Sequence, residues 1–283
     1  MKTTNQILSA VLAMAVIAIV VFLALGVAGP AFSTARLTAF VAQATPPPGD
    51  VIPLKPITDL TSLNATVKID VNGLIDGKKA KGNLNGALTS NNQGKSRVSV
   101  TGSLLGQIAA QVGGSVVGLF TPSKVDLYKV PGGAYVVVNG MFPVCVKPDT
   151  GKATEALDEM SPSSLLNMLT DSDVARGEYV GEETLNGKAV KHYVIDGDAF
   201  LVAAQNSTNP QLKAFGDALW AAEDADLYVD AAGGYPVAFK GSYSGKFEPL
   251  KFEGDFSVDI ELTDVNTNTR VDLPGACNKP ISM

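Results

Sequence analysis

The chain has 283 residues, of which 22 are Lys or Arg and 28 are Asp or Glu, so its formal net charge is −6 at pH 7. This acidic balance, without any stripe of basic residues, argues against nucleic acid as a partner. Gly is abundant at 28 residues, and there are 11 Phe and 7 Tyr, a composition that favours antiparallel strands and turns over a helix bundle.

The N-terminal region contains one long apolar segment. Residues 7–32 carry no charged side chain, which is typical of a membrane-spanning helix or a long signal sequence. Lys2 precedes this segment, so we expect the first residues in the cytoplasm and the remainder outside. Residues 1–35 are therefore predicted to anchor a single-pass cell-membrane protein with an extracytoplasmic domain. If the chain is cleaved after Ala35, the same domain is secreted.

A Pro-rich segment separates this helix from the rest of the chain. Residues 36–58 contain the sequence AQATPPPGDVIPLKP and show no periodicity, which predicts an extended linker. Residues 59–283 are predicted to form the folded β domain, which is long enough to bury a sizeable core.

The first strands of the domain are predicted as a hairpin. Apolar side chains at Val67, Ile69 and Val71 alternate with polar ones, and the Asp76-Gly77 step that follows is a turn signal. Similar patterns predict further strands at 97–102, 124–130, 133–140, 178–187, 189–197, 225–233 and 235–245.

The clearest strand covers residues 251–264. Its apolar side chains are expected to face one way and its charged side chains the other. The apolar set comprises Phe252, Phe256, Val258, Ile260 and Leu262.

Three segments are predicted as helical, at 103–120, 154–172 and 210–224. The first has almost no hydrophilic face, so we expect it to be buried in the core, to dip into a membrane or to cover an apolar cavity, and its glycines favour a mobile lid. Many half-apolar strands need a curled sheet or covering helices. The predicted fold is therefore α+β: a curled antiparallel sheet, or half-open barrel, wrapped over a few helices.

Two cysteines, Cys145 and Cys277, lie far apart in the chain. Outside the cytoplasm such a pair most often forms a disulfide, which would attach the C-terminal tail to the middle of the domain. A redox or metal pair is the alternative, but the sequence has no CxxC motif and a single histidine.

No catalytic, metal or cofactor motif is evident in the sequence. His192 lies within a predicted strand without a nucleophile motif near it, so a structural role is favoured over a catalytic one. Asp224, Asp226 and Asp230 lack the loop of a calcium-binding hand. We therefore expect a protein that is not an enzyme and needs neither a metal nor another cofactor.

Two stretches of the domain resemble a known family. The sequences YVGEETLNGKAVKHYVIDGDAF and ADLYVDAAGGYPVAFKGSY are similar to bacterial extracytoplasmic lipid and lipoprotein carriers, namely the LppX/LprG-type lipoproteins and, more distantly, LolA-type carriers. The resemblance implies a half-open barrel over helices, with an apolar cavity for acyl chains and no catalytic residue. The chain departs from those lipoproteins because no cysteine precedes Cys145, so the lipid-modified cysteine is missing. The matching residues are Gly181, Glu182, Asn186, Gly187, His192, Tyr193, Leu227, Tyr228, Val229, Asp230, Gly234 and Pro236.

The resulting hypothesis is noncatalytic binding, and transfer, of a lipid or an acylated partner at the outer face of the membrane, with residues 7–32 in the bilayer. An apolar void of more than about 300 Å³ under the sheet is the expected sign of such a carrier. The alternative is an exported structural or sensor domain of the same fold with a filled core. An exported hydrolase is disfavoured because the sequence lacks the catalytic residues that it would need. The candidate ligand-binding residues are Phe252, Phe256, Val258 and Ile260, with Leu104, Leu105, Ile108 and Leu119 as the lid.

Overall fold

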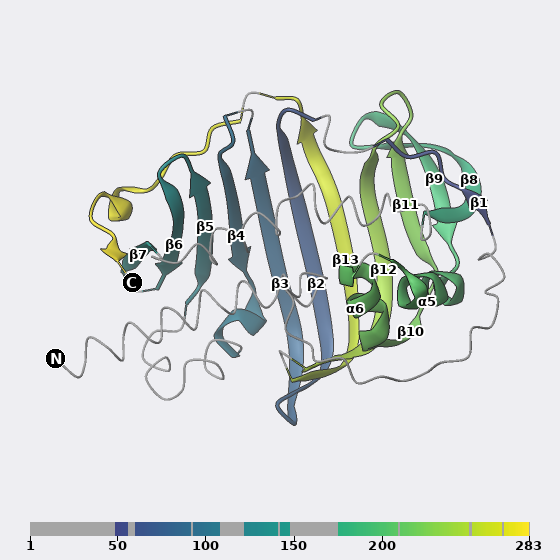
Figure 1. The fold of residues 1–283 in the computed structure, drawn as a ribbon, viewed down its shortest axis with the longest axis horizontal. Helices are drawn as coiled ribbons and strands as arrows, with labels where there is room; N and C mark the ends of the chain where they lie inside the picture. Colours follow the sequence, from purple (N-terminus) through teal and green to yellow (C-terminus); the bar gives the residue numbers. More distant parts are fainter. Residues whose placement is uncertain are drawn as a thin grey trace.

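The computed structural model describes residues 49–55, 60–91, 93–107, 122–140, 142–147, 175–208, 210–248, 251–267 and 269–282. These residues form one 14-stranded sheet with short helices against it (Figure 1). The predicted segments at 7–32 and 154–172 lie outside the described residues, as do Ile108 and Leu119. Within the described ranges, no helix has the length and apolarity needed to cross a bilayer.

The sheet is open and, apart from one pair, antiparallel, as the predicted fold class requires. Its order is β1–β8–β9–β11–β12–β13–β2–β3–β4–β5–β6–β7–β14, and β10 pairs with β12 as well. Only β7 and β14 run parallel among these described pairs. The strands are β1 (Asp50–Val51), β2 (Leu63–Ile75), β3 (Lys78–Ser90), β4 (Ser96–Thr101), β5 (Lys124–Val130), β6 (Gly133–Asn139), β7 (Pro143–Lys147), β8 (Arg176–Leu185), β9 (Lys188–Ile195), β10 (Leu219–Ala222), β11 (Ala225–Asp230), β12 (Pro236–Phe247), β13 (Phe252–Val265) and β14 (Ile281–Ser282).

Neighbouring strands align their apolar side chains on one face. On β13, Phe256 is paired with Val71 of β2, and Val258 with Ile69. The predicted alternation is confirmed, because Phe256 and Val258 are buried while Asp255 and Asp259, which flank them, are exposed. We call the apolar side the inner face and the opposite side the outer face.

A close approach of two backbones depends on glycine. Gly254 of β13 is paired with Gly73 of β2 and has a φ of +149°. A Cβ added at Gly254 would lie 2.5 Å from the Gly73 Cα, so neither strand has room for a side chain here. This pair lets the two long central strands approach closely at this point.

Two short helices cover part of the inner face. Helix α5 (Gly197–Asn206) is capped at its N-terminus by Asp196, whose side chain accepts a hydrogen bond of 2.7 Å from the Ala199 backbone N–H. Helix α6 (Pro210–Ala218) follows it, and in Figure 1 both lie in front of the strands around β12. Helix α5 follows the predicted strand 189–197 and has no counterpart among the three helices predicted from periodicity.

The predicted helix at 210–224 is wrong over its second half. The chain leaves the helix after Ala218 and forms β10, where Leu219 is paired with Gly245 of β12 and Ala222 with Tyr243. Because β11 pairs only with the first part of β12, the edge of residues 243–245 is free to bind β10. Pairing along that edge satisfies backbone groups that a longer helix would leave exposed.

The sheet also takes in residues that were predicted as linker. Within 36–58, Asp50 and Val51 form β1 against β8, and Ile52 is buried in the inner-face core. The Lys55 backbone N–H donates a hydrogen bond of 2.7 Å to the Gly234 carbonyl. The Pro-rich composition of this segment predicted an extended linker and gave no sign of these few strand-pairing positions.

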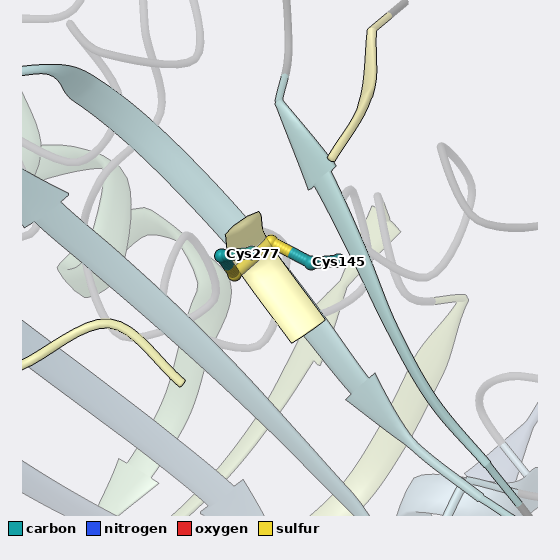
Figure 2. The surroundings of a disulfide bond; sticks show 2 residues. All are labelled: Cys145 and Cys277. Atoms are coloured by element: carbon teal, nitrogen blue, oxygen red, sulfur yellow. A yellow bond between two sulfur atoms is a disulfide. The ribbon is translucent and has the colours of Figure 1, made fainter. Parts of the chain in front are cut away.

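The predicted disulfide is confirmed, and it holds the C-terminal tail against the outer face. Figure 2 shows the bond between Cys145 of β7 and Cys277 of the short helix η4 (Gly275–Asn278). Tyr128, Val137 and Val271 pack with the two cysteines into a second apolar cluster, which we call the outer cluster. Beyond the disulfide, β14 pairs with β7.

Candidate functional site

The predicted ligand-binding residues that the structure describes share the inner-face core. Leu104 and Leu105 are fully buried, in a helical segment at 103–107, and a Cβ added to Gly82 of β3 would lie 3.0 Å from the Leu104 Cγ. Phe252, Phe256 and Val258 are buried in the same core, and Ile260 packs against it partly exposed. The structure therefore places these side chains on one side of the sheet. Whether they bind a ligand stays a prediction.

Six aromatic rings form the most distinctive part of this core. They come from both covering helices and from two neighbouring strands, so the cluster joins the cover to the sheet. We call it the aromatic cluster; its members are Phe200 of α5, Phe215 of α6, Tyr243 and Phe247 of β12, and Phe252 and Phe256 of β13.

Phe215 is the ring through which α6 enters this cluster. Its centroid lies 5.6 Å from Tyr243, 6.2 Å from Phe247, 6.4 Å from Phe200 and 6.5 Å from Phe256. Unlike those four side chains, which are buried, Phe215 is only partly buried. It therefore lies between the solvent and the apolar interior, at the boundary of the cluster.

Polar contacts attach α6 to α5. The Lys213 ammonium donates a hydrogen bond of 2.8 Å to the Gln205 carbonyl, and the Gln205 amide donates one of 3.3 Å to the Gly216 carbonyl. A Cβ at Gly216 would lie 2.5 Å from the Gln205 backbone nitrogen, so the two helices approach closely at that point. The two helices are thus joined to each other by polar contacts and to the sheet by apolar ones.

The polar member of the aromatic cluster is Tyr243. Its side chain is buried, and burial raises the pKa of its hydroxyl above its usual range, so that the group stays protonated. Among the described residues the hydroxyl has no hydrogen-bond partner. It lies over Gly241 of the same strand, since a Cβ at that position would be 2.6 Å from the hydroxyl oxygen.

Two open clefts lie on the polar outer face. The first, of about 680 Å³, crosses β10, β12, β13, β2 and β3 and is lined by side chains such as Asp70 and Asp255. The second, of about 620 Å³, crosses β2 to β5 and includes Thr66 and Arg97. Tyr243 and Phe256 also border the first cleft, but neither cleft is the expected apolar void, because polar side chains of the outer face line most of each. Between α6 and the aromatic rings of the sheet, the space is occupied by the Phe215 side chain.

A buried ion-pair group borders the second cleft. Asp126 accepts hydrogen bonds of 2.9 Å from Arg97 and 3.0 Å from Asn139, and its carboxylate lies 3.3 Å from the Lys124 ammonium. Burial by itself raises the pKa of Asp126. Hydrogen bonds from Ser99 and Arg97 and the charges of Arg97 and Lys124 outweigh it, so the pKa lies below its usual value.

His192 is held between two carboxylates on the outer face. Its Nδ1 lies 2.9 Å from Glu183 and its Nε2 lies 2.8 Å from Asp226, while its ring stacks on Tyr228 with a centroid distance of 4.5 Å. Both ring nitrogens are therefore engaged, and neither is free to take a proton from a nucleophile. This geometry fits a structural histidine that links β8, β9 and β11.

Asp224 and Asp230, which were considered together with Asp226 as a calcium site, have separate structural roles. Asp224 accepts a hydrogen bond of 3.0 Å from the Gly197 backbone at the start of α5, and Asp230 accepts one of 3.1 Å from Ala232 in the following turn. Throughout the described ranges, no group of three His, Cys, Asp or Glu side chains is arranged to hold a metal ion.

Sequence reasoning did not select four members of the aromatic cluster: Phe200, Phe215, Tyr243 and Phe247. A signal was present for two of them. Alternation on β12 continues through Phe239, Gly241, Tyr243, Gly245 and Phe247, and the glycines at alternate positions concealed how far this strand extends.

The sequence matches no protein-family model and no curated protein. Among solved structures, LprF from Mycobacterium bovis is similar with a TM-score of 0.39 and 11% identity, over 76% of this chain and 90% of that chain. A putative outer membrane lipoprotein-sorting protein domain from Vibrio parahaemolyticus gives 0.24 and 9%, over 75% and 87%. A DUF1329 family protein from Desulfovibrio piger gives 0.23 and 10%, over 76% and 88%. Since these scores are low, the ligand of this chain is inferred from its own residues.

Proposed function

We propose that the protein binds the acyl part of a lipid, or of a lipidated partner, between the inner face of the sheet and helix α6, without catalysing a reaction. The position of Phe215 carries this proposal. It is a partly exposed ring that contacts four other rings of the aromatic cluster and belongs to a short helix. If α6 swings aside, Phe215 leaves an apolar site whose remaining walls belong to the sheet and α5.

The binding energy in such a site comes from removing apolar surface from water. Each methylene of an acyl chain that enters contributes about 0.8 kcal/mol, so a chain of moderate length offsets the loss of the contacts of one phenylalanine. No catalytic group is needed for this exchange. Strand β13, which supplies Phe252 and Phe256, is paired on both sides. Strand β12, which supplies Tyr243 and Phe247, is paired with β13 along the cluster and with β10 at residues 243–245, which keeps the wall of the site in place.

The N-terminal segment gives this binding a location. If residues 7–32 remain in the bilayer, the domain is tethered near the membrane from which its ligand comes; if they are removed after Ala35, the domain is a shuttle. Transfer of the ligand to an acceptor is compatible with both arrangements.

A second candidate function is a sensor or structural domain that acts through protein contacts. The observation that favours it is the filled aromatic cluster, together with clefts on the polar face. In this case Phe215 is an ordinary core residue and α6 stays in place.

Photo-crosslinking distinguishes the two. The full-length protein in alkyl maltoside micelles is irradiated with a fatty-acid ester that carries a diazirine on its chain, digested and examined by mass spectrometry. We expect labels on peptides from α6, β12 and β13, and we expect unlabelled ester to remove them by competition.

Peptides of the outer cluster are the internal control, because Tyr128 and Val137 are apolar and buried but lie under a disulfide-bonded tail. They should carry only background label. Label confined to residues 7–32, or label that excess unlabelled ester does not reduce, would leave the sensor as the better description.

A further inference from the structure

The hydroxyl of Tyr243 lies in surroundings that do not explain its presence. The side chain is 4% exposed, and the rings of Phe256, Phe215 and Phe200 lie 5.5, 5.6 and 5.8 Å from its own ring. A phenylalanine would fill the same space and would carry no polar atom. Within the described ranges no group accepts a hydrogen bond from this hydroxyl.

The position of the oxygen is defined by the neighbouring glycine. Tyr243 and Gly241 are both on the inner face, two positions apart on β12, and the hydroxyl lies over the place where a side chain at Gly241 would begin. Gly241 is paired with Val258 of β13, which is buried and apolar. The hydroxyl is thus directed along the inner face, over a part of β12 that has no side chain of its own.

A buried hydroxyl without a hydrogen bond lowers the stability of the fold, and such groups are rare in folded proteins. The unpaired hydroxyl of Tyr243 is explained if it forms its hydrogen bond only when a ligand is present. Removing the pairing group by the Tyr to Phe change then affects binding and leaves the fold alone.

We propose that Tyr243 is the specificity-determining residue of the acyl site, and that its hydroxyl donates a hydrogen bond to a neutral carbonyl, of an ester or an amide, on the bound chain. This inference rests on the proposed acyl-binding function and names the chemical class that the site selects. An alkane chain alone would leave the hydroxyl unpaired.

The charge of the site decides between a neutral carbonyl and a carboxylate. Among the described residues the only buried charged side chain is Asp126, which lies on the outer face, so the described part of the inner face offers no buried cation to a carboxylate. Burial of an unpaired carboxylate is far more costly than burial of an ester carbonyl. The raised pKa of Tyr243 agrees with a group that stays protonated and acts as a donor.

The test compares one pair of ligands on two matched variants. The ligands are methyl laurate and a straight-chain alkane with the same number of heavy atoms. Their binding is measured by the fluorescence lost when they displace bound N-phenyl-1-naphthylamine. The protein is the full-length chain in micelles of an alkyl maltoside, which contains no carbonyl. Tyr243→Phe removes the hydroxyl under study, and Tyr228→Phe removes a hydroxyl on the outer face as the control.

Tyr243→Phe is expected to weaken methyl laurate binding by about fivefold or more, and to leave alkane binding unchanged, because one hydrogen bond in a dry site is lost. Tyr228→Phe should change neither ligand. Infrared spectra of methyl laurate with a 13C carbonyl give an independent readout: the bound ester band should lie at lower frequency in the wild type than in Tyr243→Phe.

The possible outcomes separate the inference from the function on which it rests. Equal affinity of the wild type and Tyr243→Phe for methyl laurate, with binding retained, overturns the role of Tyr243 and leaves acyl binding standing. A lower melting temperature of ligand-free Tyr243→Phe would reveal an internal partner of the hydroxyl and would also overturn it. If neither ligand binds the wild type, both the acyl site and its selectivity are refuted.

Discussion

The molecule closes its two apolar clusters in different ways. The outer cluster at β5 to β7 is covered by the C-terminal tail, and the Cys145–Cys277 disulfide makes that cover permanent. The aromatic cluster on the inner face is covered by α6, which is held by ring contacts and by two side chains, Lys213 and Gln205.

This difference indicates which cluster can exchange its contents. Opening the outer cluster requires breaking a covalent bond or unfolding three strands. Opening the aromatic cluster requires the movement of one nine-residue helix, and the ligand that enters replaces the lost apolar contacts. An acyl site is therefore expected under α6 and not under the tail.

The largest effect is expected from removing the disulfide. The bond closes a sequence separation of 132, so a Cys145→Ala, Cys277→Ala double variant should lose about 4 to 5 kcal/mol of unfolding free energy in the chain-entropy model. Chemical denaturation measures this loss. Reducing agent should destabilise the wild type and have no effect on the double variant; equal behaviour of the two proteins contradicts a clamping role.

Within the aromatic cluster, the wall and the cover should respond differently to truncation. Phe256→Ala removes a buried wall residue and should lower the unfolding free energy by about 3 to 5 kcal/mol. Phe215→Ala removes a partly exposed ring, and about 2 kcal/mol is expected because less surface is involved.

Ligand addition should distinguish a cavity under α6 from a cavity elsewhere in the core. The space freed in Phe215→Ala should bind methyl laurate more tightly than the wild type does, and the ligand should raise the melting temperature of this variant more. Leu88→Ala, a cavity elsewhere in the inner-face core, is the matched control. Equal rescue of both variants would show that the ligand only fills any hole in the core.

A smaller effect is expected from Asp126, and it depends on pH. Because its folded-state pKa lies below the usual value of 3.8, its contribution is present above that pH and is lost as pH falls through the lower folded-state pKa. Asp126→Asn should lose about 2 kcal/mol at neutral pH through its weakened hydrogen bonds to Arg97. Unfolding curves from neutral to acid pH should converge for the two proteins; a constant difference refutes this explanation.

The smallest effect is expected at His192. His192→Ala removes a link between partly exposed carboxylates on the outer face, and about 1 kcal/mol or less should be lost. Methyl laurate binding should be unchanged, since the residue is on the opposite side from the aromatic cluster. Ester hydrolysis by the wild type that disappears in this variant would contradict the noncatalytic function.

Local patterns in the sequence were sufficient for much of the sheet. The alternation through Phe252, Phe256 and Val258 indicates a strand with one buried side wherever its partners lie, because successive side chains point to opposite faces. The pairing of Cys145 with Cys277 was predicted because the chain has two cysteines and the domain was expected to lie outside the cytoplasm. The turn residues Asp76 and Gly77 likewise marked the hairpin that the structure contains.

Contacts between distant segments were beyond such patterns. Residues 219–222 have the periodicity of a helix and form a strand because an unpaired edge of β12 lies beside them. The roles of Glu183 and Asp226 at His192 depend on the alignment of β8, β9 and β11. Strand alignment of this kind is set by the whole sheet and not by the residues near each position.

That the chain builds an antiparallel sheet with one apolar face follows from residue order alone, because the period of two is a property of each strand. What covers that face depends on contacts between distant segments. The tertiary structure brings Phe215 of α6 onto rings of β12 and β13, and it leaves the Tyr243 hydroxyl buried among them. These are contacts between separate elements, and the energy of each depends on a neighbour that no local pattern identifies.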